Sequence, residues 1–338
     1  MTSTDAAPLV ITRGTLAEEE ARDVQRLAVQ GATAQALPAL FTPDARAAER
    51  FMDFFTANIR NKNTRRAYFR AACTFSAWCE GRGLHTLAAV KPVHIAAYIE
   101  NMTAAKPTVK QHLAALRMLF DWLVVGQVVA VNPAHAVRGP KHVTRTGRTP
   151  VLDREEARAL LAGIDVSTLT GLRDRALIGV MIYTFARVGA VLMMNVGDYY
   201  SQGRRGWVRL HEKGGKEHAA PCVSKLEAYL DEYIAAAAIG DDKDGPLFRT
   251  TGRSTGIAHR MTQQDGYRMI QRRAKRAGIA TRVGNHSLRA TGITDYLKHD
   301  GTLEHAQQMA NHSSPRTTKL YDRRGDEVTL DEYEKIRI

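Results

Sequence analysis

The sequence predicts a mainly α-helical protein of two domains, the second of which also carries a small antiparallel β-sheet. Its 338 residues are enough for two domains of roughly 150 residues each. Apolar residues recur at helical spacing along most of the chain, whereas short extended runs occur only in the second half. With 44% hydrophobic and 25% charged residues, the composition is that of a globular protein, which excludes a mostly disordered chain.

Residues 46–137 are predicted to form the first domain, a compact bundle of four or five helices. Pro92 and Pro107 each follow a break in the apolar pattern, where a helix can begin. Residues 1–45 form an Ala-rich N-terminal extension to which the sequence assigns no role. The apolar faces of the bundle repeat at helical spacings in three segments: Phe51, Phe54, Phe55 and Ile59; Tyr68, Ala72, Phe75 and Cys79; Val109, Leu113, Leu116, Phe120 and Leu123.

Residues 138–150, RGPKHVTRTGRTP, have the composition of an interdomain linker. They contain two glycines, two prolines and no acidic residue. On a basic protein this favours a linker that lies along a phosphate backbone, although a solvated loop with incidental charge has the same composition. The basic side chains of the linker are Arg138, Lys141, Arg145 and Arg148.

Residues 151–325 are predicted to form the second domain. It begins with a helix in LDREEARALLAGI and continues with a very apolar helix from Asp174 to Arg187, which is expected to be buried on most sides. Three strand-like runs follow, GDYY, GWVRLH and EHAAPCV, and the glycine pair within residues 213–216 predicts a hairpin between the last two. The pattern then returns to helix, and residues 326–338 form an acidic C-terminal tail.

The charge of the chain indicates a polyanionic partner. Lys and Arg number 48 against 35 Asp and Glu, which gives a formal charge of +13 and a pI near 9.8. Basic residues concentrate in residues 60–70 and 253–289. The second segment contains a predicted helix whose first turns carry Gln263, Gln264 and Tyr267, side chains that can contact bases in a DNA groove. Solvated faces are the alternative, but we expect double-stranded DNA to be contacted by Arg60, Lys62, Arg65, Arg66, Arg145, Arg148, Arg268 and Arg272.

The cysteines and the termini indicate a cytoplasmic protein without a metal. Cys73, Cys79 and Cys222 form no C-x-x-C pair, so they predict buried small side chains in a reducing compartment rather than a zinc site or a disulfide framework. The N-terminal residues lack the pattern of a signal peptide. No run of about 18 apolar residues occurs, so no membrane span is expected.

Four local features carry residues suited to chemistry, and each has an ordinary structural interpretation when taken alone. Arg187 follows the apolar helix, where a salt bridge would explain it. Lys213 lies at the predicted hairpin tip, where a solvated turn lysine is common. Two more features, His286-x-x-Arg289 and His312 nine residues before Tyr321, are equally unspecific alone.

Taken in this order, the six residues resemble the tyrosine site-specific recombinase family, also called the phage-integrase family. The resemblance covers residues from about 47 to 325. It implies a helical, SAM-like core-binding domain and a catalytic domain that form a clamp around DNA. It also implies that the catalytic residues are Arg187, Lys213, His286, Arg289 and His312, with Tyr321 as the nucleophile.

Phosphoryl transfer by such a set needs neither a metal nor ATP. Two guanidiniums can hold the non-bridging oxygens of a phosphate bidentately, in the place of metal ions. Lys213 is the expected acid for the leaving 5′-oxygen, and His286 is the expected base or proton shuttle for Tyr321. His312 is expected to donate a hydrogen bond to the phosphate. A phosphotyrosine retains the energy of the broken bond, and no G-x-x-x-x-G-K-[ST] loop occurs, so no cofactor is expected.

Two positions depart from the family pattern. Three residues after the first arginine the family usually has an acid, and here Ala190 stands, so the sequence does not indicate what orients Arg187. Before the later histidine the family usually has glycine, and here Asn311 stands. Asparagine also tolerates the left-handed conformation at a helix end, so this change is mild.

The resemblance leaves alternatives open. The missing acid at Ala190 suits a catalytically inactive relative that binds DNA as a regulator. A type IB topoisomerase has a related site but relaxes DNA instead of exchanging strands. The recombinase is expected to serve a mobile element and to act as a homo-oligomer, a tetramer on two DNA sites, in which the C-terminal tail packs on a neighbouring subunit.

Overall fold

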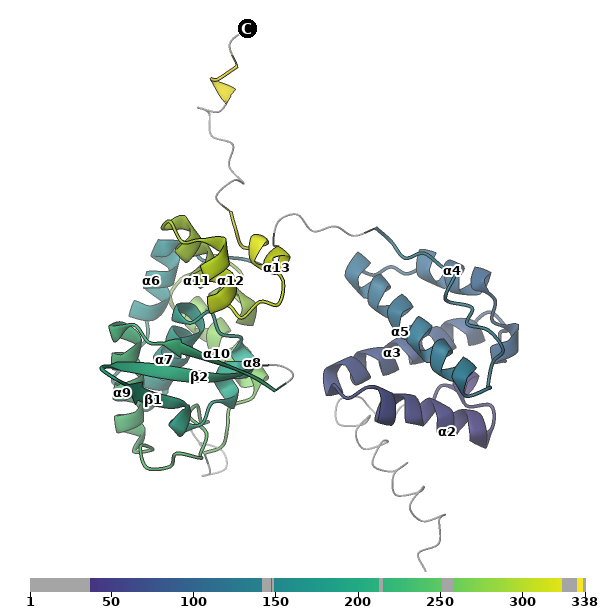
Figure 1. The fold of residues 1–338 in the computed structure, drawn as a ribbon, viewed down its shortest axis with the longest axis horizontal. Coiled ribbons are helices and arrows are strands. Elements are labelled where there is room, and N and C mark those ends of the chain that lie inside the picture. The colour runs from purple at the N-terminus through teal and green to yellow at the C-terminus, as the bar shows by residue number, and fades with distance from the viewer. Residues whose placement is uncertain are drawn as a thin grey trace, which may run out of the picture. The chain divides into compact units, whose positions relative to one another are not determined.

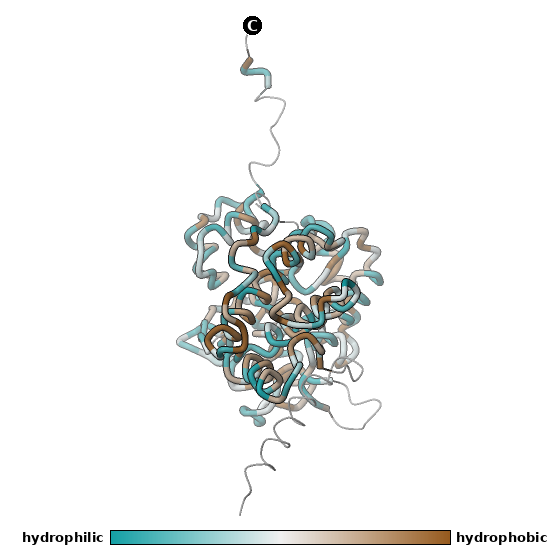
Figure 2. The backbone as a smooth tube through the Cα atoms, turned by 90° about the vertical axis from the view of Figure 1, so that its right-hand side faces the viewer, coloured by the Kyte–Doolittle hydropathy of each residue, from teal (hydrophilic) through white to brown (hydrophobic). Residues whose placement is uncertain are grey.

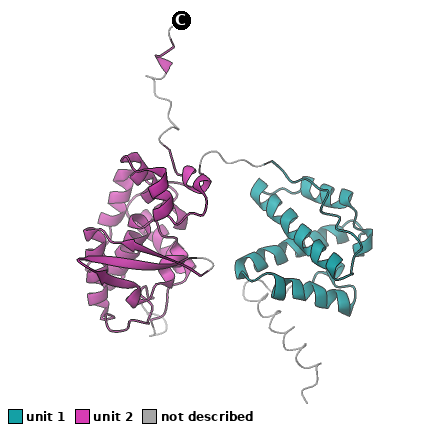
Figure 3. Ribbon diagram, viewed as in Figure 1, with its two compact units in different colours: residues 1–143 teal, residues 144–338 magenta. Residues whose placement is uncertain are grey.

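The computed structural model describes residues 37–141, 147, 149–212, 215–250, 258–323 and 333–336. The chain divides into two compact units, residues 1–143 and 144–338 (Figure 3). The described parts are mostly helical with one three-stranded antiparallel sheet, so the predicted fold class is confirmed. Within these parts, no helix combines the length and the apolar character that crossing a bilayer would require.

The first unit is a bundle of helices connected by short loops (Figure 1). Helix α2 begins after Asp44, whose carboxylate accepts from the backbone N–H of Ala47, and α3 begins after Asn61, whose side chain accepts from the N–H groups of Asn63 and Thr64. Its elements are η1 (Ala39–Phe41), α2 (Ala45–Asp53), the π-helix η2 (Phe54–Asn58), α3 (Lys62–Glu80), η3 (Leu87–Ala89), α4 (Pro92–Glu100) and α5 (Lys106–Val125).

Aromatic rings fill the centre of this bundle. Phe41 stacks on Phe51 with ring centroids 5.4 Å apart. It also makes a T-shaped contact with Phe120 of α5, with ring centroids 5.9 Å apart. Tyr98 and His112 bring polar groups into the same core and satisfy each other through a hydrogen bond of 2.8 Å. The apolar faces predicted from spacing are therefore the buried ones, and the exposed Arg66 and Arg70 lie on the opposite side of α3.

The second unit combines a sheet with helices. The strands β1 (Tyr199–Gln202), β2 (Arg205–Glu212) and β3 (Lys216–Pro221) pair antiparallel in that order, with Glu212 opposite Lys216 next to the predicted hairpin tip. The helical elements are α6 (Arg154–Ala162), α7 (Leu169–Tyr183), α8 (Val188–Met193), η4 (Val196–Asp198), α9 (Ser224–Ala237), α10 (Gln263–Arg276), α11 (Asn285–Lys298), α12 (Leu303–Met309) and α13 (Pro315–Lys319).

Helix α7 is the central element of the second unit. It packs against α9 and α11, while α8 packs against β2 and α10. Most of its residues are buried, as the apolar run predicts, and Figure 2 shows hydrophobic stretches of backbone interleaved with hydrophilic ones along the helices. The cysteines are free, and Cys79 and Cys222 are buried as expected, while Cys73 is half-buried.

The predicted end of the apolar helix is wrong. Helix α7 ends at Tyr183, four residues before Arg187, because the chain reverses at Phe185, which has a left-handed φ of 54°. Arg187 instead takes an extended conformation and is the N-cap residue of the short helix α8. An uninterrupted apolar run does not reveal such a break, because both segments on either side of it are buried.

Candidate active site and DNA-contacting residues

Arg289 is the most deeply buried of the candidate catalytic residues. It lies in the first half of α11 and is 2% exposed. Its guanidinium donates to the backbone carbonyl of Phe185 and, over 2.5 Å, to that of Ala310. A buried guanidinium without acceptors would be costly, so these two carbonyls fix both its position and its orientation.

His286 lies one turn before Arg289, in the first turn of α11, and is exposed. Partial desolvation lowers the pKa of its imidazole, and the positive charges of Arg289 and then Arg187 lower it further. The imidazole is therefore neutral at physiological pH and is available as a proton acceptor.

Arg187 is held by a carboxylate instead of carbonyls. Its Nη1 atom lies 2.5 Å from Oε2 of Glu212, the last residue of β2. The Arg187 side chain is 38% exposed, whereas that of Glu212 is 5% exposed. The guanidinium thus has one edge against a buried acid and another edge open to solvent.

His312 and Tyr321 face each other at the end of the second unit. His312 lies in the turn between α12 and α13, and its Nδ1 atom is 2.9 Å from Oγ1 of Thr318. The two rings are stacked, with centroids 5.7 Å apart and an angle of 11° between their planes. Asn311 has a left-handed φ of 46°, so the expectation that asparagine takes this conformation before the histidine is confirmed.

The segment that carries Tyr321 is attached to the chain at the start of the second unit. Thr294 of α11 donates through Oγ1 to the carbonyl of Tyr321 over 3.1 Å. The N–H of Gly147 donates to the carbonyl of Leu320 over 2.9 Å, and Arg323 donates to the carbonyls of Gly147 and Thr149. These hydrogen bonds hold the backbone around Tyr321 against α11 and against residues 147 and 149.

Electrostatic coupling shows that these side chains share one site. Burial first, and then the charge of Arg187, lower the pKa of Arg289 to about 10, while Tyr321 and Glu212 act in the opposite direction. Burial and the same two guanidiniums lower the pKa of His312 to about 4, so its ring is neutral at physiological pH. Five of the six predicted residues are thus together, whereas Lys213 lies outside the described residues.

Two contributors to this site were not found from the sequence, Glu212 and Thr318. Glu212 directly precedes Lys213 in the chain, but no spacing rule links it to Arg187, which is 25 residues away. Thr318 belongs to the threonine pair before Tyr321, and that was the only available signal for it. Among the described residues, no group of three or more His, Cys, Asp or Glu side chains is arranged to hold a metal ion.

The predicted DNA-contacting residues of the first unit are mostly exposed. Arg60, Lys62 and Arg66 have free access to solvent at the start of α3. Arg65 differs, because both Nε and Nη2 donate to the carbonyl of Ile59, over 3.1 and 2.8 Å. Its guanidinium therefore also anchors the turn that leads into α3.

In the second unit, part of the basic stretch is structural. Asp174 is fully buried and accepts from Arg173 and Arg273, both almost fully buried, and from the half-exposed Arg272. Arg260 is likewise occupied, by the carbonyls of Leu192 and Met194 and the side chain of Asn195. Within residues 253–289, Arg273 and Arg260 are thus engaged by acceptors of the fold, and we expect the phosphate contacts from the accessible members of the stretch.

Other members of this stretch remain accessible. Arg268 is exposed on α10, as are Gln263, Gln264 and Tyr267 in its first turns. The predicted linker contacts Arg145 and Arg148 lie outside the described residues. The accessible side chains are the ones suited to a phosphate or a groove.

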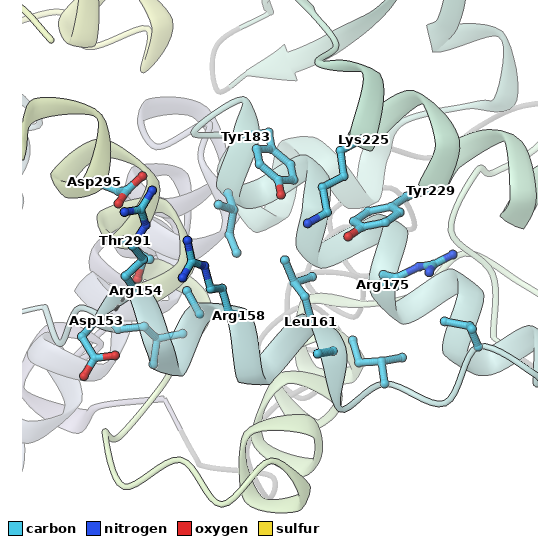
Figure 4. A pocket seen from close by; sticks show the side chains of 16 residues that line it. Asp153, Arg154, Arg158, Leu161, Arg175, Tyr183, Lys225, Tyr229, Thr291 and Asp295 are labelled. Carbon is cyan, nitrogen blue, oxygen red and sulfur yellow. Dashed lines mark hydrogen bonds between the residues drawn. The ribbon is translucent and has the colours of Figure 1, made fainter. Parts of the chain in front are cut away.

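A separate cavity of about 540 Å³ is lined by residues of α6, α7, α9 and α11 (Figure 4). Arg158 and Lys225 lie across it from each other, and Tyr183 lies beside Lys225. None of the five described catalytic candidates lines this cavity, so it is distinct from the site around Tyr321.

Comparison with known protein families agrees with this architecture. Residues 150–327 match the phage integrase family, and residues 48–128 match the phage integrase N-terminal SAM-like domain. The first match spans more than half of the chain, so the protein belongs to the phage integrase family. The resemblance drawn from the six residues is thereby confirmed.

Individual relatives agree with this assignment. The tyrosine recombinase XerD of Ralstonia nicotianae is 28% identical over 77% of this chain and 83% of its own. The XerH site-specific recombinase, in a post-cleavage complex with a palindromic difH substrate, has a TM-score of 0.66 at 19% identity, covering 94% of this chain and 96% of that one. A lambda integrase tetramer bound to a Holliday junction has a TM-score of 0.64 at 18% identity, covering 94% and 90%. These structures share the fold.

Proposed function

We propose that this protein is a site-specific tyrosine recombinase that cuts and rejoins DNA through a 3′-phosphotyrosine intermediate, for a mobile element. The observation that carries the proposal is one connected group of charged and polar side chains: His312 stacks on Tyr321, Arg289 interacts with Tyr321 and Arg187, and both arginines act on two neutral imidazoles. A structural ion pair would not require both histidines beside them.

The proposed cleavage step is a transesterification. The Tyr321 oxygen attacks the scissile phosphorus, the P–O5′ bond breaks, and the products are a 3′-phosphotyrosine and a free 5′-hydroxyl. A 5′-hydroxyl from a second DNA strand then attacks the phosphotyrosine and regenerates Tyr321. One phosphoester replaces another in each step, so the sequence of steps needs no ATP.

The arginines stabilise the charge of the transition state. Arg289 remains protonated at physiological pH, because its pKa of about 10 is still well above neutrality. Tyr321 raises the pKa of Arg289, so the positive charge of this guanidinium lies near the attacking oxygen. Arg187 offers its open edge to the non-bridging oxygens. When Thr318 donates to Nδ1 of His312, Nε2 carries the proton and donates to the phosphate.

Proton transfer is assigned to two further residues. His286 is neutral, exposed and close to both arginines, which suits a base that accepts the tyrosine proton. Lys213 follows Glu212 directly, and we assign it the role of the acid that protonates the leaving 5′-oxygen. The expected consequence is that activity needs neither a metal nor ATP.

The substrate we propose is double-stranded DNA that is contacted by both units. Exposed basic residues occur on α3 in the first unit and α10 in the second, which supports contacts with phosphate from both. We further propose a homotetramer on two DNA sites, in analogy to the lambda integrase tetramer on a Holliday junction. Strand exchange between two duplexes requires four cleavages, which suits four active sites.

The decisive test is covalent capture on a nicked suicide duplex, chosen by binding selection from a random-sequence DNA library. We expect the wild-type protein to form a covalent adduct in EDTA, and Tyr321→Phe to bind the same DNA with nearly unchanged affinity but to form none. Tyr333→Phe is the matched control, because Tyr333 is also near the C-terminus but is 61% exposed among acidic neighbours. Mass spectrometry that places the nucleotide on Tyr333 would contradict the assignment.

The same experiment separates the alternatives. A DNA-binding relative without catalysis gives a complex but no adduct with the wild-type protein. A topoisomerase gives an adduct and relaxes supercoils, but it does not exchange strands between two sites. Adduct formation that requires added magnesium would mean that the arginines are not the main stabilisers of charge.

A further inference from the structure

Glu212 reaches the active site from a different element than the residue it contacts. Arg187 caps α8, and Glu212 ends β2, 25 residues later in the chain. The two meet because α8 packs against β2. The carboxylate is almost fully buried and lies 2.5 Å from the guanidinium, so this is a short, partly desolvated ion pair and not a surface contact.

The position from which an acid would reach Arg187 within α8 is occupied by alanine. Ala190 lies three residues after Arg187, on the same side of the helix turn, and is 4% exposed. Its methyl group offers no acceptor. In the described part of the chain, Glu212 is the one carboxylate paired with Arg187. The acceptor that α8 itself lacks is therefore provided by the neighbouring strand.

We propose that Glu212 is the positioning residue for Arg187, which it holds in the orientation needed to stabilise the scissile phosphate. This inference rests on the proposed recombinase function. The pair engages Nη1 of Arg187 and leaves the donors on Nη2 and Nε for the phosphate oxygens. A guanidinium that is hydrogen-bonded through one nitrogen keeps its plane in a defined orientation. Without that bond, it rotates about the single bonds of the arginine side chain.

Glu212 has a second, electrostatic effect on the same site. Arg187 and Arg289 repel each other: the charge of Arg187 lowers the pKa of Arg289, and the charge of Glu212 raises it. Arg289 cannot move away from Arg187, because its guanidinium is hydrogen-bonded to the buried carbonyls of Phe185 and Ala310. Arg187 is half-exposed and is free to move outward. Without Glu212, repulsion therefore acts to displace Arg187 from the phosphate site.

The test compares Glu212→Gln with Glu217→Gln in the full-length protein. Glu217 lies on the adjacent strand β3 with a 64% exposed side chain, so it controls for the loss of one carboxylate from the same hairpin. The adduct-forming rate is measured in single-turnover reactions on the library-selected nicked duplex. We expect Glu212→Gln to slow adduct formation about tenfold to a hundredfold, with DNA affinity unchanged within about twofold, and Glu217→Gln to match the wild type.

A neutral substrate distinguishes positioning of Arg187 from a general structural role. In a duplex with a methylphosphonate at the mapped scissile position, one non-bridging oxygen is replaced by methyl, and the negative charge that Arg187 binds is removed. We expect the defect of Glu212→Gln to shrink to less than about threefold on this duplex. Each rate ratio is taken within one protein sample, so an inactive fraction of the variant cancels.

Four outcomes decide whether Glu212 positions Arg187. An equal defect on the charged and the neutral substrate, or a Glu212→Gln rate equal to that of the wild type, overturns the positioning role while leaving the recombinase function intact. A defect confined to the charged substrate supports it. If the wild-type protein itself forms no adduct, the proposed function fails first, and the positioning role falls with it.

Discussion

Arg187 and Arg289 belong to one site but are held in opposite ways. Arg289 is buried and held by two neutral backbone carbonyls, one from the turn after α7 and one from the end of α12. Arg187 is half-exposed and held by the charged side chain of Glu212. Arg289 therefore depends on the main-chain fold around it, whereas Arg187 depends on a single side chain.

This difference has a physical reason. A buried guanidinium retains its charge only if acceptors surround it, and carbonyls can provide them without adding a second charge. A half-exposed guanidinium is hydrated on one side, so it needs an anchor rather than full compensation. The two arginines should accordingly respond differently to substitution, and the following predictions test that contrast.

The largest effect is expected at Arg289. Arg289→Met has a side chain of similar length but no donors, so it leaves the carbonyls of Phe185 and Ala310 unpaired in the interior. We expect the free energy of unfolding to fall by about 3 kcal/mol and adduct formation to fall at least about a thousandfold. Chemical denaturation and the suicide-duplex assay measure the two. Arg276→Met, which removes an exposed arginine, is the control and should change neither.

At Arg187 the loss of stability should come from its partner. Arg187→Met leaves the buried carboxylate of Glu212 without a cation, which we expect to cost about 3 kcal/mol in the free energy of unfolding. Adding Glu212→Gln to the same protein should restore part of that loss, while adduct formation remains at least about a hundredfold reduced. A double variant no more stable than Arg187→Met alone would show that the pair is not a desolvated one.

The neutral state of His312, which both arginines favour, predicts a pH dependence of stability. Its folded pKa of about 4 lies below the usual 6.5, so the unfolded state binds a proton more readily. The stabilisation is complete above pH 6.5 and is lost as pH falls toward 4, by up to about 3 kcal/mol. Other groups titrate in this range, so the measurement is the difference in unfolding free energy between wild type and His312→Gln at pH 7 and pH 4.5. A difference that does not change with pH would contradict the depressed pKa.

The smallest effect is expected on α3, where the same contrast between a free and a held arginine recurs. Arg66→Ala removes an exposed cation, so we expect about threefold weaker DNA binding and a salt dependence shallower by about one unit. Arg65→Ala also removes the two bonds to Ile59 and should lower the free energy of unfolding by about 1 kcal/mol. Salt titrations of binding, with thermal unfolding in parallel, distinguish the two. Identical profiles for both variants would remove the distinction.

Much of the candidate site was predictable because its residues sit in recognisable local contexts. His286 and Arg289 are one turn apart on α11, and the turn with Asn311 and His312 takes the left-handed conformation that asparagine suggested. The end of α7 was not predictable, because Phe185 gives no sign in sequence of its left-handed φ. The pairing of Arg173 and Arg273 with Asp174 was also missed, because the sequence of a basic stretch does not show which of its arginines are paired and which are exposed.

The sequence by itself determined the helical class, the position of the sheet and the order of the six candidate residues, because periodicity and short motifs are properties of neighbouring residues. Only the tertiary structure decided which side chains hold them. Residue 190 lacks the acid that the motif suggests, and the acid that replaces it comes from β2 through the packing of α8 on the sheet. Contacts between elements depend on packing in three dimensions, and a short carboxylate–guanidinium pair across 25 residues leaves no periodic trace in the chain.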